Sequence, residues 1–283
     1  MNKYFCIIII FLLIIYLIEN KKINGGNNYY ESNKISYEEV ENMIKNKKVI
    51  IVGPAEYVMK ENGDNFGKFI DSHDIVIKLN NMIGQPKKLD KYYGSRCDIL
   101  ISSFWPAKLD GLKFTNKYEL EENYKLHKNT IIIANYHGDK FLKEIIGKFK
   151  NISEKSNKFL VFDDKTISKS RKLLDSYEKL PNKKTYGTGT YAIANILNMK
   201  PKTLYVTGIT VYLDKKYNGY YPFYNNKKIQ KKITNYFDGK NFNYNIEIGH
   251  NIQYEQNVYK NLINNNKTIN VDNYIKKLIN WCK

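Results

Sequence analysis

Short runs of apolar residues recur along the chain, and they are the feature that most constrains its fold. Val, Ile and Leu dominate the runs, which are continuous in the way of parallel strands that are buried on both faces. Segments with helical periodicity lie between several of them. Strands that alternate with helices predict an α/β domain, with a Rossmann-like, mostly parallel sheet and helices on both faces. The runs are residues 47–52, 75–79, 99–101, 130–134, 159–162 and 204–207, and the helical patterns are 140–149, 167–180, 191–199 and 271–281.

The segments that follow these runs are the places to look for a ligand site. In open parallel sheets, ligands bind beyond the carboxyl ends of the strands, where the chain turns away. Gly53, Asn80 and Ser102 directly follow the first three runs. Residues 136–138 and the segment from Gly208 onward come after two later runs.

An uncharged apolar run of fifteen residues occupies positions 4–18, between charged residues on both sides. It is short for a bilayer span of about 20 residues. It also has the length of a long signal-peptide core, but no small-residue cleavage site follows it. We interpret residues 1–22 as an uncleaved transmembrane helix in preference to a cleaved signal, residues 23–46 as a stem or linker, and residues 47–283 as the catalytic domain.

Positive charge is abundant but spread out. Lys and Arg total 46 against 28 Asp and Glu, which gives a net charge of +18 and raises the possibility of a nucleic-acid or membrane partner. Only Arg96 and Arg171 are arginines, and Lys lacks the planar fork with which Arg binds phosphate. We therefore expect no nucleic-acid partner, although a diffuse positive field could attract an anionic substrate.

The cysteines give no sign of a metal site. Cys6, Cys97 and Cys282 form no C-x-x-C pair and no His/Cys spacing typical of zinc. Cys97 and Cys282 could pair, but their positions do not show that they do. No Asp-x-Asp motif stands out after a strand, so we expect neither a metal nor another cofactor.

The stretch from residue 49 to residue 103 carries the first of three motifs. Gly53 permits close approach of the backbone to a phosphate or a ribose. The stretch has neither G-x-G-x-x-G nor G-x-x-x-x-G-K, so a dinucleotide fingerprint or a P-loop has little support, and a plain strand and loop stays an alternative. The residues that make up this motif, in chain order, are Gly63, Gly67, Ile70-Asp71-Ser72-His73-Asp74, Val76, Asn80 and Gly94-Ser95-Arg96.

The second motif is a glycine turn, Gly187-Thr188-Gly189, that opens a predicted helix. The amino end of a helix presents unpaired N–H groups and the positive end of its dipole, which suits a phosphate. Thr188 could equally serve only as the N-cap of the helix.

The third motif is the pair His250 and Glu255, which are separated by four residues. An imidazole with a pKa near 6.5 can take a proton from a hydroxyl at neutral pH. A lone His is more often a structural residue. Between the second and third motifs, Tyr212 and Tyr220 carry hydroxyls that could donate to a departing phosphate, although packing is an alternative for any tyrosine of this chain.

Taken in order, these stretches resemble the large, small and very small sialylmotifs of the animal-type sialyltransferases, glycosyltransferase family 29, over about residues 47–265. The segment of Tyr212 and Tyr220 is similar to a pair of tyrosines in the bacterial sialyltransferases of family 42. The resemblance implies a GT-A-like variant of the Rossmann fold. It also implies inverting transfer of sialic acid from CMP-sialic acid to a glycan hydroxyl.

The resemblance also implies roles for single residues. His250 would be the general base, Asn80 would contact the CMP donor, and Asp71 and Glu255 would be structural. With the strand and helix ends considered above, the expected donor-binding residues are Gly53, Asn80, Ser102, Thr188, Gly189, Tyr212 and Tyr220.

This chain departs from the family pattern at several places. The family's cysteine pair is missing, Lys78 stands where the family has Arg, and no His occurs in residues 212–221. The donor could therefore be another CMP-activated acid such as KDO, or the chain could be a non-catalytic homologue that binds CMP or a sugar. The expected location is a membrane of the Golgi or an equivalent secretory compartment, as a single-pass type II glycoprotein. Sequons at Asn151 and Asn266 are compatible with that location.

Overall fold

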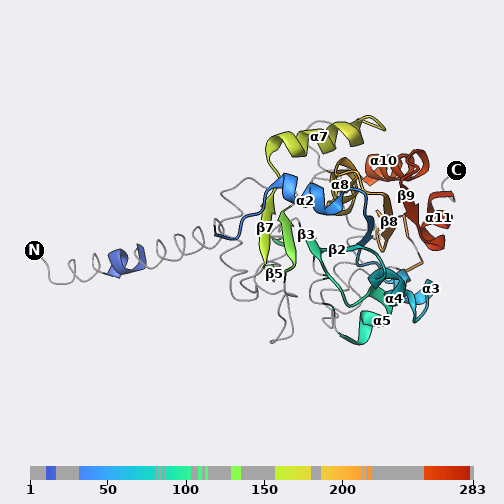
Figure 1. The fold of residues 1–283 in the computed structure, drawn as a ribbon, viewed down its shortest axis with the longest axis horizontal. Coiled ribbons are helices and arrows are strands. Elements are labelled where there is room, and N and C mark those ends of the chain that lie inside the picture. Colours follow the sequence, from blue (N-terminus) through green and yellow to red (C-terminus); the bar gives the residue numbers. More distant parts are fainter. Residues whose placement is uncertain are drawn as a thin grey trace, which may run out of the picture.

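A seven-stranded sheet forms the centre of the protein, and its neighbouring strands are parallel throughout. The strand order is β7-β6-β3-β2-β1-β8-β9 (Figure 1). The computed structural model describes residues 11–16, 32–80, 82, 85, 87–102, 108–109, 112–113, 129–134, 157–179, 186–211, 213–214, 216–217 and 252–280. The strands of the sheet are β1 (Lys48–Val52), β2 (Ile75–Leu79), β3 (Ile99–Ser102), β6 (Ile131–Ala134), β7 (Lys158–Val161), β8 (Thr203–Thr207) and β9 (Ile269–Val271).

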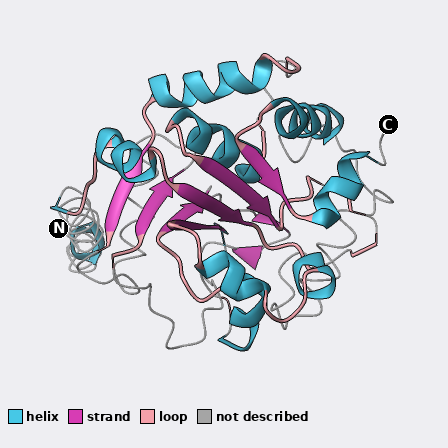
Figure 2. Ribbon diagram, turned by 45° about the vertical axis from the view of Figure 1, so that its right-hand side comes forward, coloured by secondary structure: helices cyan, strands magenta, loops and turns pink. Residues whose placement is uncertain are grey.

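Helices lie on both faces of this sheet (Figure 2). The predicted α/β architecture with a Rossmann-like, mostly parallel sheet is therefore confirmed. Three of the predicted helices correspond to α7, α8 and α11, whereas the fourth, at residues 140–149, lies outside the described residues. The helices are α2 (Tyr37–Ile44), α3 (Tyr57–Glu61), α4 (Phe66–Asp71), α5 (Asp90–Tyr93), α7 (Asp164–Asp175), α8 (Thr188–Asn198), α10 (Ile252–Asn265) and α11 (Asn273–Asn280), with a 3₁₀ turn η2 (Lys87–Leu89) and a small hairpin of β4 (Lys108–Leu109) and β5 (Leu112–Lys113).

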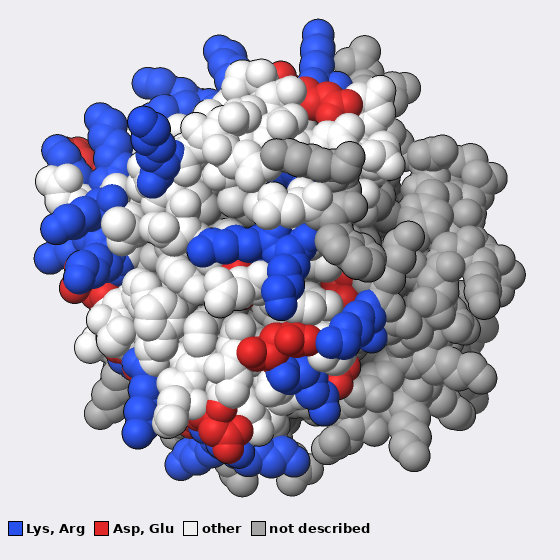
Figure 3. Space-filling view, turned by 90° about the vertical axis from the view of Figure 1, so that its right-hand side faces the viewer, with Lys and Arg blue, Asp and Glu red and all other residues white. Residues whose placement is uncertain are grey.

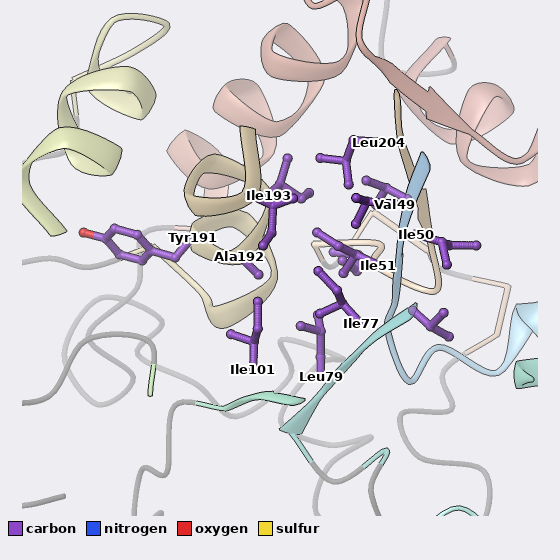
Figure 4. Close-up of a cluster of buried hydrophobic side chains, with 14 of the residues drawn as sticks. Val49, Ile50, Ile51, Ile77, Leu79, Ile101, Tyr191, Ala192, Ile193 and Leu204 are labelled. Carbon is purple, nitrogen blue, oxygen red and sulfur yellow. The ribbon is translucent and has the colours of Figure 1, made fainter. Parts of the chain in front are cut away.

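The central strands are apolar along their length because both of their faces are covered. On one face, Ala192 and Ile193 of α8 pack toward Val49, Ile51 and Ile77 of the strands (Figure 4), and all five residues are fully buried. Full burial of a Val or Ile side chain stabilises the fold by about 1.5–3 kcal/mol. The burial explains why these strands show no alternation of apolar and polar residues in the sequence.

Residues 33–46, which the sequence assigns to the linker, are part of this domain. Two residues of this segment exchange backbone hydrogen bonds of 2.8 and 3.0 Å with Phe159 on β7, and Val40 of α2 is fully buried. Ser36 and Glu39 form a capping box at the start of α2. A Ser-x-x-Glu pattern ahead of an apolar residue is a helix-start signal, so the sequence held the information that places this helix.

The predicted membrane anchor falls largely outside the described part of the chain. Of residues 1–22, the structure describes residues 11–16. Among the helices that it describes, none has the length and the apolar character needed to cross a bilayer. The anchor stays a prediction.

The backbones of β1 and β8 come into contact just beyond their carboxyl ends, at Gly53 and Gly208. The N–H of Gly53 donates to the carbonyl oxygen of Thr207 at 2.8 Å, and the N–H of Ala55 donates to that of Gly208 at 3.1 Å. A Cβ atom on either glycine would overlap the carbonyl oxygen of the other. The strand order reverses between β1 and β8, so this contact marks the switch point of the sheet, where open α/β sheets bind their ligands.

Replacing Gly208 by Ala should lower the free energy of unfolding by about 2–5 kcal/mol, because the added methyl group meets backbone and the residue has a left-handed φ of 70°. Gly63 is the matched control, since its φ is 77° but nothing lies within 4 Å of an added Cβ atom. Gly63→Ala should cost only the left-handed strain, about 1–2 kcal/mol. Urea denaturation measures both. Equal losses would show that the contact between β1 and β8 tolerates side chains.

Candidate functional site

The carboxylate of Glu255, on α10, holds the amino end of α8. Its Oε1 atom accepts hydrogen bonds from the N–H of Gly187 at 2.8 Å and from the hydroxyl of Thr190 at 2.7 Å, and the residue is 2% exposed. A Cβ atom on Gly187 would lie 2.6 Å from this oxygen, so a side chain there would displace the carboxylate of Glu255. Gly187 takes the N-cap position, which leaves Thr188 as the first residue of the helix. A carboxylate here is favoured by the helix dipole.

Two glycines from distant parts of the sequence, Gly53 and Gly189, lie against the side chain of Ile209. A Cβ atom on Gly189, in the first turn of α8, would lie 2.8 Å from Ile209 Cγ2. One on Gly53 would lie 2.7 Å from Ile209 Cγ1. Because Ile209 directly follows Gly208, the start of α8 lies against the switch point of the sheet.

Asn80 and Ser102 lie side by side at the same edge, which we call the carboxyl edge because the parallel strands end there. The hydroxyl of Ser102 donates to Asn80 Oδ1 at 3.3 Å. Asn80 has a left-handed φ of 48°, a conformation that Asn adopts more readily than most residues. β2 lies between β1 and β3, so this pair is on the edge that also carries Gly53.

Helix α10 contributes two further side chains to the carboxyl edge, and the sequence did not reveal them. The hydroxyl of Tyr259 donates to the carbonyl oxygen of Ile209 at 2.6 Å, and Gln256 Nε2 donates to that of Val211 at 3.2 Å. Tyr259 is fully buried. Tyr259 stands four residues after Glu255, so the two side chains lie on the same face of the helix. This spacing could have indicated from the sequence that Tyr259 lies near the site. α10 thus fixes both the start of α8 and the segment after β8.

A buried polar network holds Gly208 in place. The N–H of Gly208 donates to the Tyr57 hydroxyl at 2.6 Å, and that hydroxyl donates to Asp272 Oδ2 at 2.6 Å. The hydroxyl of Thr207 donates to the same carboxylate oxygen at 2.7 Å. The other oxygen, Oδ1, accepts the N–H of Ile275 at 2.9 Å, in the first turn of α11.

Burial sets the chemistry of this network. Burial, and then the charge of Asp272, raise the pKa of Tyr57 well above its usual range, so its hydroxyl keeps its proton. Asp272 is 4% exposed and reaches the switch point from near the carboxyl terminus. Nothing in the sequence separated Tyr57 from the other tyrosines of the chain, which number 25.

Asp71 lies at the opposite, amino edge of the sheet. Its carboxylate accepts hydrogen bonds from the N–H of Ser95 at 2.9 Å and from the N–H of Arg96 at 3.1 Å. Arg96 donates in turn to the carbonyl oxygens of Asp71 at 2.7 Å and His73 at 2.8 Å, and to Asp98 Oδ2 at 2.8 Å. These contacts join the turn before β2 to the turn before β3.

Three of the predicted site residues, His250, Tyr212 and Tyr220, lie outside the described residues. His250 precedes the first residue of α10 by two positions in the sequence. Their roles therefore stay predictions, as do the donor-binding roles of the residues that the structure does bring together.

Cys97 is a free, buried thiol, and Cys282 lies outside the described residues. Burial raises the pKa of the Cys97 thiol to about 11. In the part of the chain that the structure describes, His, Cys, Asp and Glu do not gather in groups of three or more that could hold a metal. The expectation that the reaction needs no metal stays a prediction.

No family model and no curated protein matches the sequence. Among solved structures, the monofunctional alpha-2,3-sialyltransferase Cst-I from Campylobacter jejuni aligns over 84% of this chain and 77% of its own, with 16% identity and a TM-score of 0.43. An alpha-2,3-sialyltransferase from Campylobacter jejuni in apo form aligns with the same coverage and identity and a TM-score of 0.40. Both alignments are loose, so the roles of the residues depend on the geometry of this chain.

Replacing Tyr57 by Phe should lower the free energy of unfolding by about 1–3 kcal/mol, because the buried N–H of Gly208 loses its acceptor. Tyr93→Phe is the matched control. Tyr93 is equally buried, and its hydroxyl donates a hydrogen bond of 3.0 Å to the carbonyl oxygen of Ala55. The N–H of Gly208 donates to Tyr57 instead. That variant should lose about 0.5–1.5 kcal/mol. Urea denaturation with equal losses in both would contradict a special role for Tyr57.

Proposed function

We propose that the chain is a sialyltransferase-like glycosyltransferase, which transfers sialic acid from CMP-sialic acid to a glycan hydroxyl with inversion. One observation carries the proposal. Gly53, Gly189 and Glu255 come from three stretches that resemble the large, small and very small sialylmotifs, and they lie together at the carboxyl edge. That edge is where a sheet of this topology binds its ligand.

The start of α8 is the proposed place for the phosphate of CMP. The first N–H groups of a helix have no partner within the helix and point toward an anion. The N–H of Gly187 is already used by Glu255, whose charge offsets part of the helix dipole. The phosphate therefore needs further hydrogen-bond donors. In the proposed site, the hydroxyls of Tyr212 and Tyr220 supply them. Asn80 and Ser102, at the ends of β2 and β3, contact the nucleoside part.

In the proposed reaction, His250 acts as the general base. It takes the proton of the acceptor hydroxyl while that oxygen attacks the anomeric carbon of sialic acid. The bond from the anomeric carbon to the phosphate oxygen breaks, and CMP leaves with the electron pair. Preorganised hydrogen-bond donors around the departing phosphate typically contribute a few kcal/mol each to lowering the barrier.

The proposed location follows from the amino-terminal run. Residues 1–22 anchor the chain as a single-pass type II protein in the Golgi or an equivalent secretory compartment. The domain then lies outside the cytosol, where glycan acceptors are found.

Incubation of the protein with CMP-sialic acid and a mixture of glycans should release CMP. His250→Ala should lower turnover by about 10²- to 10⁴-fold, the usual contribution of a general base. His73→Asn is the control, because His73 lies at the amino edge, where its carbonyl oxygen contacts Arg96. That variant should keep its turnover.

Other outcomes discriminate between the candidate functions. Turnover of CMP-KDO but not of CMP-sialic acid would change the donor and keep the reaction type. Binding of CMP without turnover of any CMP-activated sugar would point to a non-catalytic homologue. Unchanged turnover in His250→Ala would remove this residue from the mechanism.

A further inference from the structure

The two carboxylate oxygens of Glu255 have different surroundings. Oε1 accepts both of the hydrogen bonds that hold the start of α8, from the N–H of Gly187 at 2.8 Å and from the hydroxyl of Thr190 at 2.7 Å. Oε2 is buried, and among the described residues it has no hydrogen-bond partner. A Cβ atom on Gly187 would lie 3.4 Å from Oε2, so this oxygen also lies beside the N-cap of the helix. Capping therefore uses only one of the two oxygens.

The charge of this carboxylate has no neighbouring cation to offset it in the described part of the chain. The ion pairs that lysines and arginines form there do not include Glu255. Arg171, on the adjacent helix α7, is already paired with Asp175 at 3.4 Å. Tyr186, directly before the N-cap of α8, donates to the same Asp175 side chain at 2.8 Å. Burial, and then this hydrogen bond, raise the pKa of Tyr186, so its hydroxyl keeps its proton.

Among the described residues, the other elements around Glu255 add no compensating cation either. The first turn of α8 has no charged side chain, and Tyr259 on α10 uses its hydroxyl as a donor to Ile209. Lys260 is five positions along α10 and therefore projects from another side of that helix. Directly after β9, Asp272 is a second buried carboxylate. A buried charge that is incompletely offset acts strongly on its surroundings, because little water screens it.

The overall charge of the protein acts in the opposite direction. The net charge is +18, and Figure 3 shows lysine and arginine side chains spread over one face of the molecule. A diffuse positive field attracts the more negative of two ligands more strongly, and so does the amino end of a helix. A preference for the less charged ligand must therefore come from a local negative charge, and Glu255 supplies one at the start of α8.

The charge on the phosphate changes during the proposed reaction. In CMP-sialic acid the phosphate is a diester, which carries one negative charge. In CMP it is a monoester, whose second pKa is about 6, so at neutral pH it carries close to two negative charges. A carboxylate beside the phosphate therefore opposes binding of the product more strongly than binding of the donor.

We propose that Glu255 makes the start of α8 prefer the phosphodiester of the donor to the dianion of CMP, and thereby speeds the release of CMP. This role rests on the proposed function, which puts the phosphate at that helix start. Glu255 acts here through its charge, in addition to capping the helix. The same charge opposes the negative charge that builds on the phosphate as the bond to the sugar breaks, which is a further reason for the tyrosine hydroxyls of the proposed site.

The test compares CMP with the methyl ester of CMP, a diester with one negative charge, by isothermal titration calorimetry of the full chain at pH 7.5. Glu255→Gln keeps an oxygen that can accept both capping hydrogen bonds, but it removes the charge. Because repulsion scales with the charge of the ligand, the variant should bind CMP at least about tenfold more tightly and the methyl ester only about threefold more tightly. At pH 5, where CMP also carries one charge, both ligands should gain equally.

Asp163→Asn is the matched control. Asp163 is the exposed N-cap of α7, and its Oδ1 atom accepts the N–H of Thr166 at 2.7 Å. Helix α7 follows β7, which lies four strands away from β1 in the sheet. The control thus removes one negative charge and keeps a helix cap, far from the switch point. It should change either affinity less than about twofold, because water and salt screen exposed charges.

No gain in Glu255→Gln, or an equal gain for the two ligands at pH 7.5, would overturn this role of Glu255. So would the same gain in Asp163→Asn, because net charge alone would explain it. The wild type gives a test that needs no variant to fold, since it should bind CMP no more tightly than the methyl ester, and tighter binding of CMP would contradict the proposal. If the wild type bound neither ligand, the proposed function itself would fail, and the role of Glu255 with it.

Discussion

The contact between Gly53 and Gly208 is the constraint on which the carboxyl edge depends. Each backbone lies where the other's side chain would be, so β1 and β8 can pair to their last residues before the chain turns away. The start of α8 then reaches the same point through Gly189 and Ile209. A side chain at Gly53 or Gly208 would separate β1 from β8, and one at Gly189 would push the helix away.

Two buried carboxylates from the last third of the chain hold this arrangement. Glu255 fixes the start of α8, and Asp272, through Tyr57, fixes the N–H of Gly208. Both are almost fully buried. Hydrogen bonds within the protein reach both oxygens of Asp272 and the Oε1 atom of Glu255, and such bonds offset the cost of burying a carboxylate. The carboxyl-terminal elements α10, β9 and α11 therefore do more than extend the sheet, because they set the geometry at its switch point.

The sequence predicted the sheet well because its strands are buried on both faces and their apolar character is continuous. It missed β9, whose three residues are too few for a pattern, and it assigned the well-capped α2 to the linker. The glycines, Asn80 and Glu255 were found from their places at strand and helix ends and from motif resemblance. The partnership of Tyr57 and Asp272 was not predictable, since 215 positions separate two residues whose contact only the fold creates.

The proposed function requires the carboxyl edge to hold a cytidylate. Hydrogen exchange measured with and without CMP tests it most directly. We expect CMP to slow exchange at the amides of Gly53, Ala55, residues 187–190 and residues 208–209, and to leave the amides of residues 45–48 and 94–96 at the amino edge unchanged. Slowed exchange confined to the amino edge, or no change at any of these amides at saturating CMP, would contradict the account.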